Sequence, residues 1–148
     1  MGSCVFCRIA QREEHAYIVY EGGSVVVFLD IYPVEKGHLL VVPVKHYESS
    51  TDVDECTICR VFTTAAVFSR IYIQELGAPG VNILANSGRA AGQEIFHFHV
   101  HVIPRWSGGG WKKLLSRRVL VDSEAEEVLS MLKPYTHYVD QSLSRLKC

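Results

Sequence analysis

The sequence lacks the features that mark several classes of protein. It has no basic surplus, because 15 lysines and arginines stand against 16 aspartates and glutamates, for a formal charge of −1. Binding to DNA or RNA depends largely on neutralising phosphates, so we expect no nucleic-acid partner. The longest apolar runs, residues 24–29 and 38–44, are much too short to cross a bilayer. We therefore expect no membrane partner either.

Export signals and paired cysteines are also missing. The start, Met1-Gly2-Ser3-Cys4, has neither the basic flank nor the apolar core of a signal peptide. The chain has five cysteines, an odd number, and without export a disulfide framework is not favoured. Reduced thiols or metal ligands are the better interpretations. The predicted location is the cytoplasm, with the nucleus as the alternative.

The rest of the composition is that of one ordinary globular domain. The chain has 148 residues and a mass of 16.6 kDa, with 48% hydrophobic and 21% charged residues, which predicts a single domain over residues 1–148. Its glycines match neither a dinucleotide-binding fold nor a phosphate-cradling GxxxxGK[ST] loop. We therefore expect no organic cofactor.

Five β-prone runs are spread along the chain. The first two, residues 17–21 and 24–29, surround Gly22-Gly23, a two-residue hairpin signal. A third run at residues 38–42 ends at Pro43. Two more runs follow at residues 81–86 and 95–103.

Residues 53–76 form the clearest predicted helix, since their apolar side chains recur at three- and four-residue steps. Thr51 and Asp54 resemble a capping box at its start. A last helix is predicted to begin at Ser123, with Glu126 completing a second capping box, and to stop before Pro134. Strands joined by a hairpin and loops around one long helix predict an α+β fold.

Three histidines alternate with apolar residues in the run H-F-H-V-H-V-I at residues 97–103. On a strand, alternate side chains share a face, so we predict a row of imidazoles roughly 6.5–7 Å apart above an apolar back. Such a row can hold one neutral ring as a nucleophile beside a protonated donor. A phosphorus centre suits this chemistry, because an imidazole nitrogen can displace the leaving group and the phosphorus–nitrogen bond is then hydrolysed. Satisfied polar residues and a three-histidine metal site are the alternatives.

The same run resembles, without a departure, the signature H-φ-H-φ-H-φ-φ of the histidine triad (HIT) family, where φ is apolar. The resemblance covers residues 4–105 and is closest to the histidine triad nucleotide-binding branch. It includes F-L-D-I-Y-P at residues 28–33, Gly37-His38 to Pro43, Lys45-His46, Asn86 and Ala91-Gly92-Gln93. The resemblance implies a HIT-like domain with an antiparallel sheet of about five strands, one long helix and one or more short helices. Its core would span residues 4–105, followed by a C-terminal extension at residues 106–148.

The resemblance also implies catalytic roles. His99, the middle histidine, would attack the α-phosphate of a nucleotide and become a nucleotidyl-histidine. His101 would hydrogen-bond oxygens of the phosphate or the leaving group. His38 resembles the upstream histidine that supports the site.

Nucleotide-binding residues follow from the resemblance in the same way. Asp30 would accept both ribose hydroxyls, since the two oxygens of a carboxylate can chelate vicinal hydroxyls. Gln93 and Asn86 resemble residues at or near the phosphate. The purine slot would be lined by Phe6, Phe28 and Ile31. The alternative for Asp30 is a turn-forming role, and the alternative for Phe28 and Ile31 is a place in the ordinary core.

One position departs from the nucleotide-binding branch. A serine often follows the glutamine there, whereas this chain has Glu94. A carboxylate would repel a phosphate and attract a cationic leaving group. Substrate preference therefore does not transfer simply from the family.

A metal site is implied by the resemblance as well. Cys4 and Cys7 form a CxxC that resembles half of a zinc site, which His46 and His97 would complete. Such a closed shell would make a structural zinc site; two free thiols are the alternative. A second CxxC, Cys56 and Cys59, falls on the polar side of the long predicted helix and is best interpreted as incidental thiols, and Cys148 as a surface thiol.

The predicted function is an adenosine 5′-monophosphoramidase-like nucleotide hydrolase, which cleaves purine nucleoside phosphoramidates at the α-phosphate through a nucleotidyl-histidine. A dinucleoside polyphosphate hydrolase is the first alternative, and a non-catalytic nucleotide-binding adaptor is the second. The resemblance implies a homodimer with two active sites.

Overall fold

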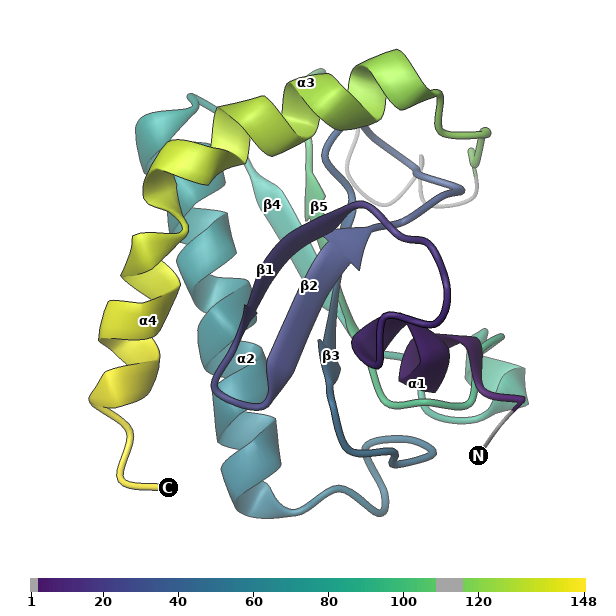
Figure 1. Ribbon diagram of the computed structural model, residues 1–148. Helices are drawn as coiled ribbons and strands as arrows, with labels where there is room; N and C mark the ends of the chain where they lie inside the picture. Colours follow the sequence, from purple (N-terminus) through teal and green to yellow (C-terminus); the bar gives the residue numbers. More distant parts are fainter. Residues whose placement is uncertain (1–2, 109–115) are drawn as a thin grey trace.

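A computed structural model describes residues 3–108 and 116–148 (Figure 1), so residues 109–115 of the predicted extension lie outside it. The described strands form one antiparallel sheet in the order β1-β2-β3-β5-β4. The strands are β1 (Ile18–Gly22), β2 (Val25–Leu29), β3 (Leu39–Pro43), β4 (Val81–Leu84) and β5 (Val100–Pro104). The α-helices are α1 (Val5–Ala10), α2 (Glu55–Arg70), α3 (Asp122–Leu132) and α4 (His137–Ser144). Short turns of other helix types lie at Ile71–Glu75, Arg89–Ala91 and Lys133–Tyr135. The predicted α+β class with a five-stranded antiparallel sheet is confirmed.

The central strands are buried on both faces. Alternate residues of β2, β3 and β5, such as Val27, Val41 and Val100, pack into the main core with α2. The residues between them, such as Phe28 and Leu40, pack under α1 on the other side of the sheet (Figure 1). This two-residue alternation follows from strand geometry. It also gives the molecule two separate apolar layers, and the smaller one, under α1, borders the histidines.

The β1–β2 hairpin turns one residue later than predicted. Gly22 still pairs with Val25, and the two loop residues are Gly23 (φ 57°) and Ser24 (φ 68°). A two-residue hairpin loop of this kind needs positive φ at both positions, because only that twist matches the flanking strands. The expected Gly22-Gly23 loop is therefore wrong by one position.

Helix α2 begins later than predicted and is capped differently. Asp54 is the N-cap, and its side chain accepts a hydrogen bond from the backbone N–H of Thr57. The Thr51 hydroxyl contacts Ser49 instead, so the predicted Thr51–Asp54 capping box is wrong. The helix runs on through a π-helical turn at Ile71–Glu75. By length and hydropathy Glu55–Glu75 could cross a membrane, but here it packs against β2, β3, β5 and α4.

The C-terminal helices share the main core. Helix α3 has Val121 as its N-cap with no side-chain hydrogen bond, and Ser123 lies inside its first turn, so the predicted Ser123–Glu126 box is wrong. The helix ends at Leu132, before Pro134 as predicted. Helix α4 was not predicted. It packs beside α2, and Asp140 on it accepts a hydrogen bond from the hydroxyl of Tyr20 (2.6 Å).

Strand β5 starts five residues later than predicted. Pro43 would be the neighbour of Phe98, but it has no N–H to donate, and the N–H of Phe98 bonds to the carbonyl of Tyr47 (2.7 Å) instead. The ladder therefore stops at Val100, and His97 and His99 precede the regular strand. The expected row of three imidazoles on one strand face is wrong for this reason. Strand β4 likewise ends at Leu84 rather than at residue 86.

Candidate functional site

A cavity of about 230 Å³ lies at the border of the smaller apolar layer. Among the residues with predicted roles, it is lined by Phe6, Phe28, Asp30, Ile31, His99 and His101. Phe28 and His101 lie on the same sheet face, since both are in register with Leu40. Phe6 and Phe28 are buried, whereas Ile31 is 51% exposed at the opening. The two phenylalanines are thus both core residues and cavity walls.

His99 lies in this cavity as a neutral ring, and one of its nitrogens has no hydrogen-bond partner among the residues that the structure describes. Its Nδ1 is 2.6 Å from the carbonyl oxygen of His97, and because a carbonyl only accepts, Nδ1 carries the proton. That leaves a lone pair on Nε2. Burial lowers the pKa of His99, despite the opposing effect of the His97 carbonyl. Phe6 packs edge-on against the ring, with the centroids 5.1 Å apart. A neutral, oriented imidazole with a free lone pair has the properties of a nucleophile.

His38 and His101 form a directed hydrogen-bond chain. The backbone N–H of Val34 donates to Nδ1 of His38 (3.1 Å), so Nε2 of His38 carries the proton. Nε2 of His38 lies 2.9 Å from Nδ1 of His101, and the proton therefore points at His101. His101 must then carry its own proton on Nε2, as a donor. The ring centroids of His99 and His101 are 5.0 Å apart, closer than the predicted strand spacing.

Asp30 joins this chain from the end of β2. Its Oδ2 is 3.5 Å from Nε2 of His38, and its Oδ1 accepts a hydrogen bond from the N–H of Tyr32 (2.9 Å). Burial raises the pKa of Asp30. Burial also lowers the pKa of His38 well below its usual value and that of His101 to about 3. The buried histidines are therefore neutral rings that act through the direction of their N–H groups.

The residue before His38 must be glycine. Gly37 has a φ of 88°, and a Cβ there would lie 2.8 Å from the hydroxyl oxygen of Tyr72. That hydroxyl donates to the Gly37 carbonyl (2.5 Å) from a fully buried ring on the π-helical turn. The π-helical turn that follows α2 thus fixes the backbone that carries His38.

Two predicted phosphate contacts lie outside the cavity lining. Gln93 is 3% exposed, and its amide is fully engaged: Oε1 accepts from Gly88 N–H (2.8 Å), and Nε2 donates to the carbonyls of Glu48 (2.6 Å) and Ile95 (3.1 Å). Asn86 lies beside Gly92, with Nδ2 3.6 Å from where a Cβ would stand. Gln93 thus joins the loop at Glu48 to the segment from Gly88 to Ile95.

Arg117 lines the cavity and was missed by the sequence analysis. Its Nη1 is 3.6 Å from Oε2 of Glu94, which lines the cavity too. The backbone beside it is held by hydrogen bonds from Arg118 N–H to Pro33 O (3.3 Å) and from Leu120 N–H to Ile31 O (2.9 Å). No local pattern marks Arg117, because the backbone hydrogen bonds that position its segment join residues 118 and 120 to residues 33 and 31, more than eighty residues earlier. Glu94 is therefore paired with a cation, which the sequence alone did not indicate.

The four predicted metal ligands converge on one point beside α1. The ligand atoms of Cys4, Cys7, His46 and His97 all lie within 4.8 Å of one another. Nδ1 of His97 is 3.4 Å from Sγ of Cys4, 3.5 Å from Sγ of Cys7 and 3.2 Å from Nδ1 of His46. Tetrahedral zinc places sulfur and nitrogen ligands about 3.5 Å apart and two nitrogens about 3.3 Å apart. The spacing therefore fits zinc.

The surroundings of this cluster also suit a metal. Nε2 of His97 is 2.8 Å from the Pro43 carbonyl, so it carries the proton and leaves the Nδ1 lone pair facing the cluster. Burial and, to a smaller extent, the neighbouring Cys4 together raise the pKa of Cys7 to about 11. The remaining thiols lie elsewhere: Cys56 is half-buried and Cys59 exposed on α2, and Cys148 is exposed.

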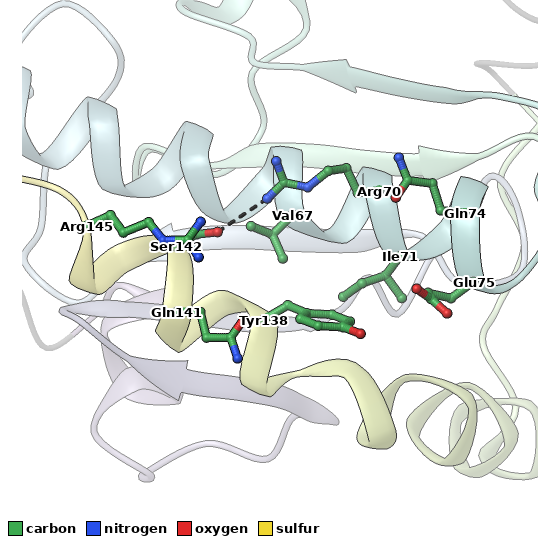
Figure 2. Close-up of a pocket in the computed structure, with 9 residues that line it drawn as sticks. All are labelled: Val67, Arg70, Ile71, Gln74, Glu75, Tyr138, Gln141, Ser142 and Arg145. Atoms are coloured by element: carbon green, nitrogen blue, oxygen red, sulfur yellow. Dashed lines mark hydrogen bonds between the residues drawn. The ribbon is translucent and has the colours of Figure 1, made fainter.

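A second cavity, of about 280 Å³, lies between α2 and α4 (Figure 2). Its walls include Arg70, Ser142 and Arg145, and Arg70 donates to the Ser142 hydroxyl (3.3 Å). It holds none of the residues with predicted roles, and its described lining has no histidine or cysteine. The histidine cavity is therefore the candidate active site.

Known proteins are similar to most of this chain. The HIT domain family model matches residues 11–108. An uncharacterized HIT-like protein of Methanocaldococcus jannaschii is 40% identical over 130 residues, covering 88% of this chain and 98% of its own. The adenylylsulfatase HINT3 of Arabidopsis thaliana is 30% identical over 136 residues, which cover 88% of this chain and 68% of HINT3.

A solved structure agrees with these sequence matches. The crystal structure of a Zn-bound histidine triad family protein from Mycobacterium smegmatis superposes with a TM-score of 0.80 at 34% identity, covering 95% of this chain and 97% of the other. The family match, the fold and the histidines lead to one conclusion: this chain belongs to the histidine triad (HIT) family.

Proposed function

We propose that the protein is a nucleotide hydrolase that cleaves purine nucleoside phosphoramidates at the α-phosphorus, with adenosine monophosphoramidates as the first substrates to test. The observation that carries this proposal is the free Nε2 of His99 in a cavity shared with Asp30 and the Nε2–H of His101. The name of the relative, adenylylsulfatase HINT3, supports transfer of an adenylate group.

The reaction has two steps. Nε2 of His99 attacks the α-phosphorus, a phosphorus–nitrogen bond forms, and the bond to the leaving group breaks with its electron pair on the leaving group. Nε2–H of His101 donates to a phosphate or leaving-group oxygen or nitrogen. Water then attacks phosphorus and the phosphorus–nitrogen bond breaks, which restores neutral His99. Overall, water supplies a hydroxyl group to phosphorus and a proton to the leaving group.

The nucleoside would be held by the rest of the cavity. Asp30 is placed to accept the two ribose hydroxyls, because each carboxylate oxygen has two lone pairs and Oδ1 uses one for Tyr32. The apolar walls of Phe6, Phe28 and Ile31 suit a flat base. Asn86 and Gln93 would support the phosphate side through the loop that they hold.

Zinc would be held by Cys4, Cys7, His46 and His97. Four protein ligands close the coordination shell, so the metal would supply structural rigidity rather than an activated water. Because His97 also accepts the Nδ1–H of His99 through its carbonyl, a rigid His97 would keep the nucleophile in its tautomer and orientation.

Mass spectrometry of protein quenched during turnover tests the proposal. We expect adenylate attached to His99 in the wild type and none in His99→Ala. Steady turnover without any adduct on His99 would exclude this mechanism. If no substrate is turned over above the His99→Ala background while AMP still binds, the protein is a nucleotide-binding adaptor.

A dinucleoside polyphosphate hydrolase is the second candidate, and Arg117 at the cavity favours it, because a guanidinium suits a pyrophosphate leaving group. A competition assay between an adenosine phosphoramidate and diadenosine tri- or tetraphosphate separates the two.

We also propose a homodimer, as the resemblance implies. Strand β4 is an edge of the sheet, and Ile83 on it is 38% exposed; such an edge is a template for pairing with another chain. Sedimentation equilibrium would then give twice the 16.6 kDa chain mass, whereas a single-chain mass at micromolar concentration would reject the dimer.

A further inference from the structure

The charges around the nucleotide cavity are unbalanced toward acid. Among the described residues its lining contains the carboxylates Glu14, Asp30 and Glu94, and one guanidinium, Arg117. A nucleotide adds at least one negative charge at the α-phosphate. Arg117 is therefore the group in this lining that can compensate an anionic substrate, although it is paired with Glu94 in the structure.

The position of Arg117 is fixed by its neighbours. Backbone hydrogen bonds join Arg118 to Pro33 and Leu120 to Ile31, so this segment runs alongside the residues that follow Asp30. The Arg118 guanidinium also binds both carboxylate oxygens of Glu124 (3.0 and 2.9 Å). The charge of Arg117 reaches into the cavity, where it lowers the pKa of His101 after the larger effects of burial and His99.

The ion pair between Arg117 and Glu94 is weak enough for a substrate anion to replace Glu94. Its side chains are 39% and 74% exposed, and the contact is a single one at 3.6 Å. Exposed pairs of this kind contribute little to stability. A substrate anion with better geometry can therefore replace Glu94 on the guanidinium, since paired N–H groups match planar or tetrahedral oxyanions well.

The in-line geometry of displacement indicates which anion this is. The leaving group departs on the side of phosphorus opposite the nucleophile. His99 is 7% exposed at the floor of the cavity, so the leaving group points toward solvent. Arg117 and Glu94 are exposed residues of the same lining as His99 and His101, and the charge of Arg117 acts on the His101 ring, so the pair borders the open part of the cavity next to these rings.

We propose that Arg117 releases Glu94 and binds a negatively charged group carried by the leaving group, such as an amino-acid carboxylate, a sulfate or a phosphate. This rests on the proposed function and deepens it, because it assigns specificity within the same reaction. Glu94 acts as the competitor: it holds Arg117 when the leaving group is uncharged and lowers the apparent affinity for anionic ones.

A matched pair of substrates tests this directly. Adenosine 5′-phosphoramidates of glycine and of glycinamide differ in the leaving group only by a carboxylate against an amide. We expect the wild type to prefer the glycine conjugate in kcat/KM. Arg117→Gln should lower kcat/KM for the glycine conjugate about tenfold and change the glycinamide conjugate much less. Arg117→Lys should keep part of the preference, because it keeps the charge.

Two further variants complete the design. Glu94→Gln should raise kcat/KM for the glycine conjugate about threefold, because it frees Arg117. Arg145→Gln is the matched control, since Arg145 is exposed at the end of α4 and does not line this cavity; it should leave the rates with both substrates unchanged. The preference of the wild type should also shrink as salt is added, because the site is exposed.

Each other outcome decides the matter. If Arg117→Gln lowers kcat/KM equally for both conjugates, Arg117 acts on the α-phosphate and the assignment is overturned. If it lowers kcat/KM for neither conjugate, Arg117 does not bind the leaving group and the assignment is overturned as well. If the wild type hydrolyses neither conjugate and forms no His99 adduct, the proposed function fails instead. In that case, the Kd values of the two conjugates by calorimetry still decide the role of Arg117.

Discussion

Two histidines four residues apart, His97 and His101, end in environments of opposite character. His97 turns toward two thiols and His46, where four ligand atoms converge. His101 lies on β5 and continues a chain of hydrogen bonds from His38 into the cavity. His99 joins the two regions, because its Nδ1 bonds to the His97 carbonyl while its ring faces the cavity.

The difference comes from one backbone group in each region. The Pro43 carbonyl accepts a hydrogen bond from the Nε2–H of His97, so the lone pair on Nδ1 faces the thiols. The Val34 N–H donates a hydrogen bond to Nδ1 of His38, so the proton of His38 is on Nε2 and points at His101. Converging lone pairs make a metal site, whereas alternating donors and acceptors make a proton-directing chain. The backbone therefore assigns a role to each of these chemically identical side chains.

The largest predicted effect is on the residue that joins the regions. His99→Ala should lower kcat at least about 10⁴-fold, because it removes the nucleophile itself. The protein should still fold, since the ring makes one backbone hydrogen bond. Steady-state kinetics measures the loss, and His137→Ala on α4, an exposed histidine far from the cavity, is the control. A residual rate within tenfold of the wild type would show that another group attacks phosphorus.

Removing the proposed zinc should destabilise the cluster of Cys4, Cys7, His46 and His97 before it affects the proton-directing chain. We expect Cys7→Ser or a zinc chelator to lower Tm by about 10 °C, the size expected for loss of a tight ligand in a domain of this length. Thermal unfolding and elemental analysis of zinc per chain measure this. Cys59→Ser, an exposed thiol on α2, should change neither quantity. A Cys7→Ser protein that retains one zinc per chain would contradict the ligand set.

The proton-directing chain should respond less strongly than the nucleophile. His38→Ala removes the donor that fixes the tautomer of His101, and we expect kcat to fall about 10–100-fold with little change in KM. His101→Ala should cost more, and the double variant should be no slower than His101→Ala alone, because His38 acts through His101. Independent, additive losses would mean that His38 contacts the substrate itself.

Much of this comparison could be predicted from the sequence. Hydrophobic alternation and turn residues predicted the five strands and the α+β class, because strand periodicity depends on local sequence. The residues of the cluster came together as the family resemblance implied. The turn of His97 away from the strand could not be predicted, since it depends on Pro43 and the Tyr47 carbonyl, about fifty residues earlier.

Contacts between distant segments account for the other differences. Gln93 matched a phosphate position, but its amide is occupied by the carbonyls of Glu48 and Ile95. Arg117 gave no signal, because its segment is placed at the cavity by backbone hydrogen bonds from residues 118 and 120 to residues 33 and 31, more than eighty residues earlier. Local patterns predict elements, whereas these roles depend on which segments the fold places side by side.

The last predicted effect concerns pH and the proton-directing chain, and it acts on stability rather than on turnover. Burial lowers the pKa of His101 from its usual value of 6.5 to about 3. Burial also lowers the pKa of His38. At pH values between the folded and the unfolded pKa of these histidines, the unfolded chain binds more protons than the folded one. Stability should therefore be complete above about pH 6.5 and fall as the pH drops, by up to about 1.4 kcal/mol per pH unit for each histidine. Urea unfolding between pH 4 and 7 measures the slope. His101→Gln should make it shallower, whereas His137→Ala should not; an unchanged slope in His101→Gln would mean that His101 is already charged in the folded protein.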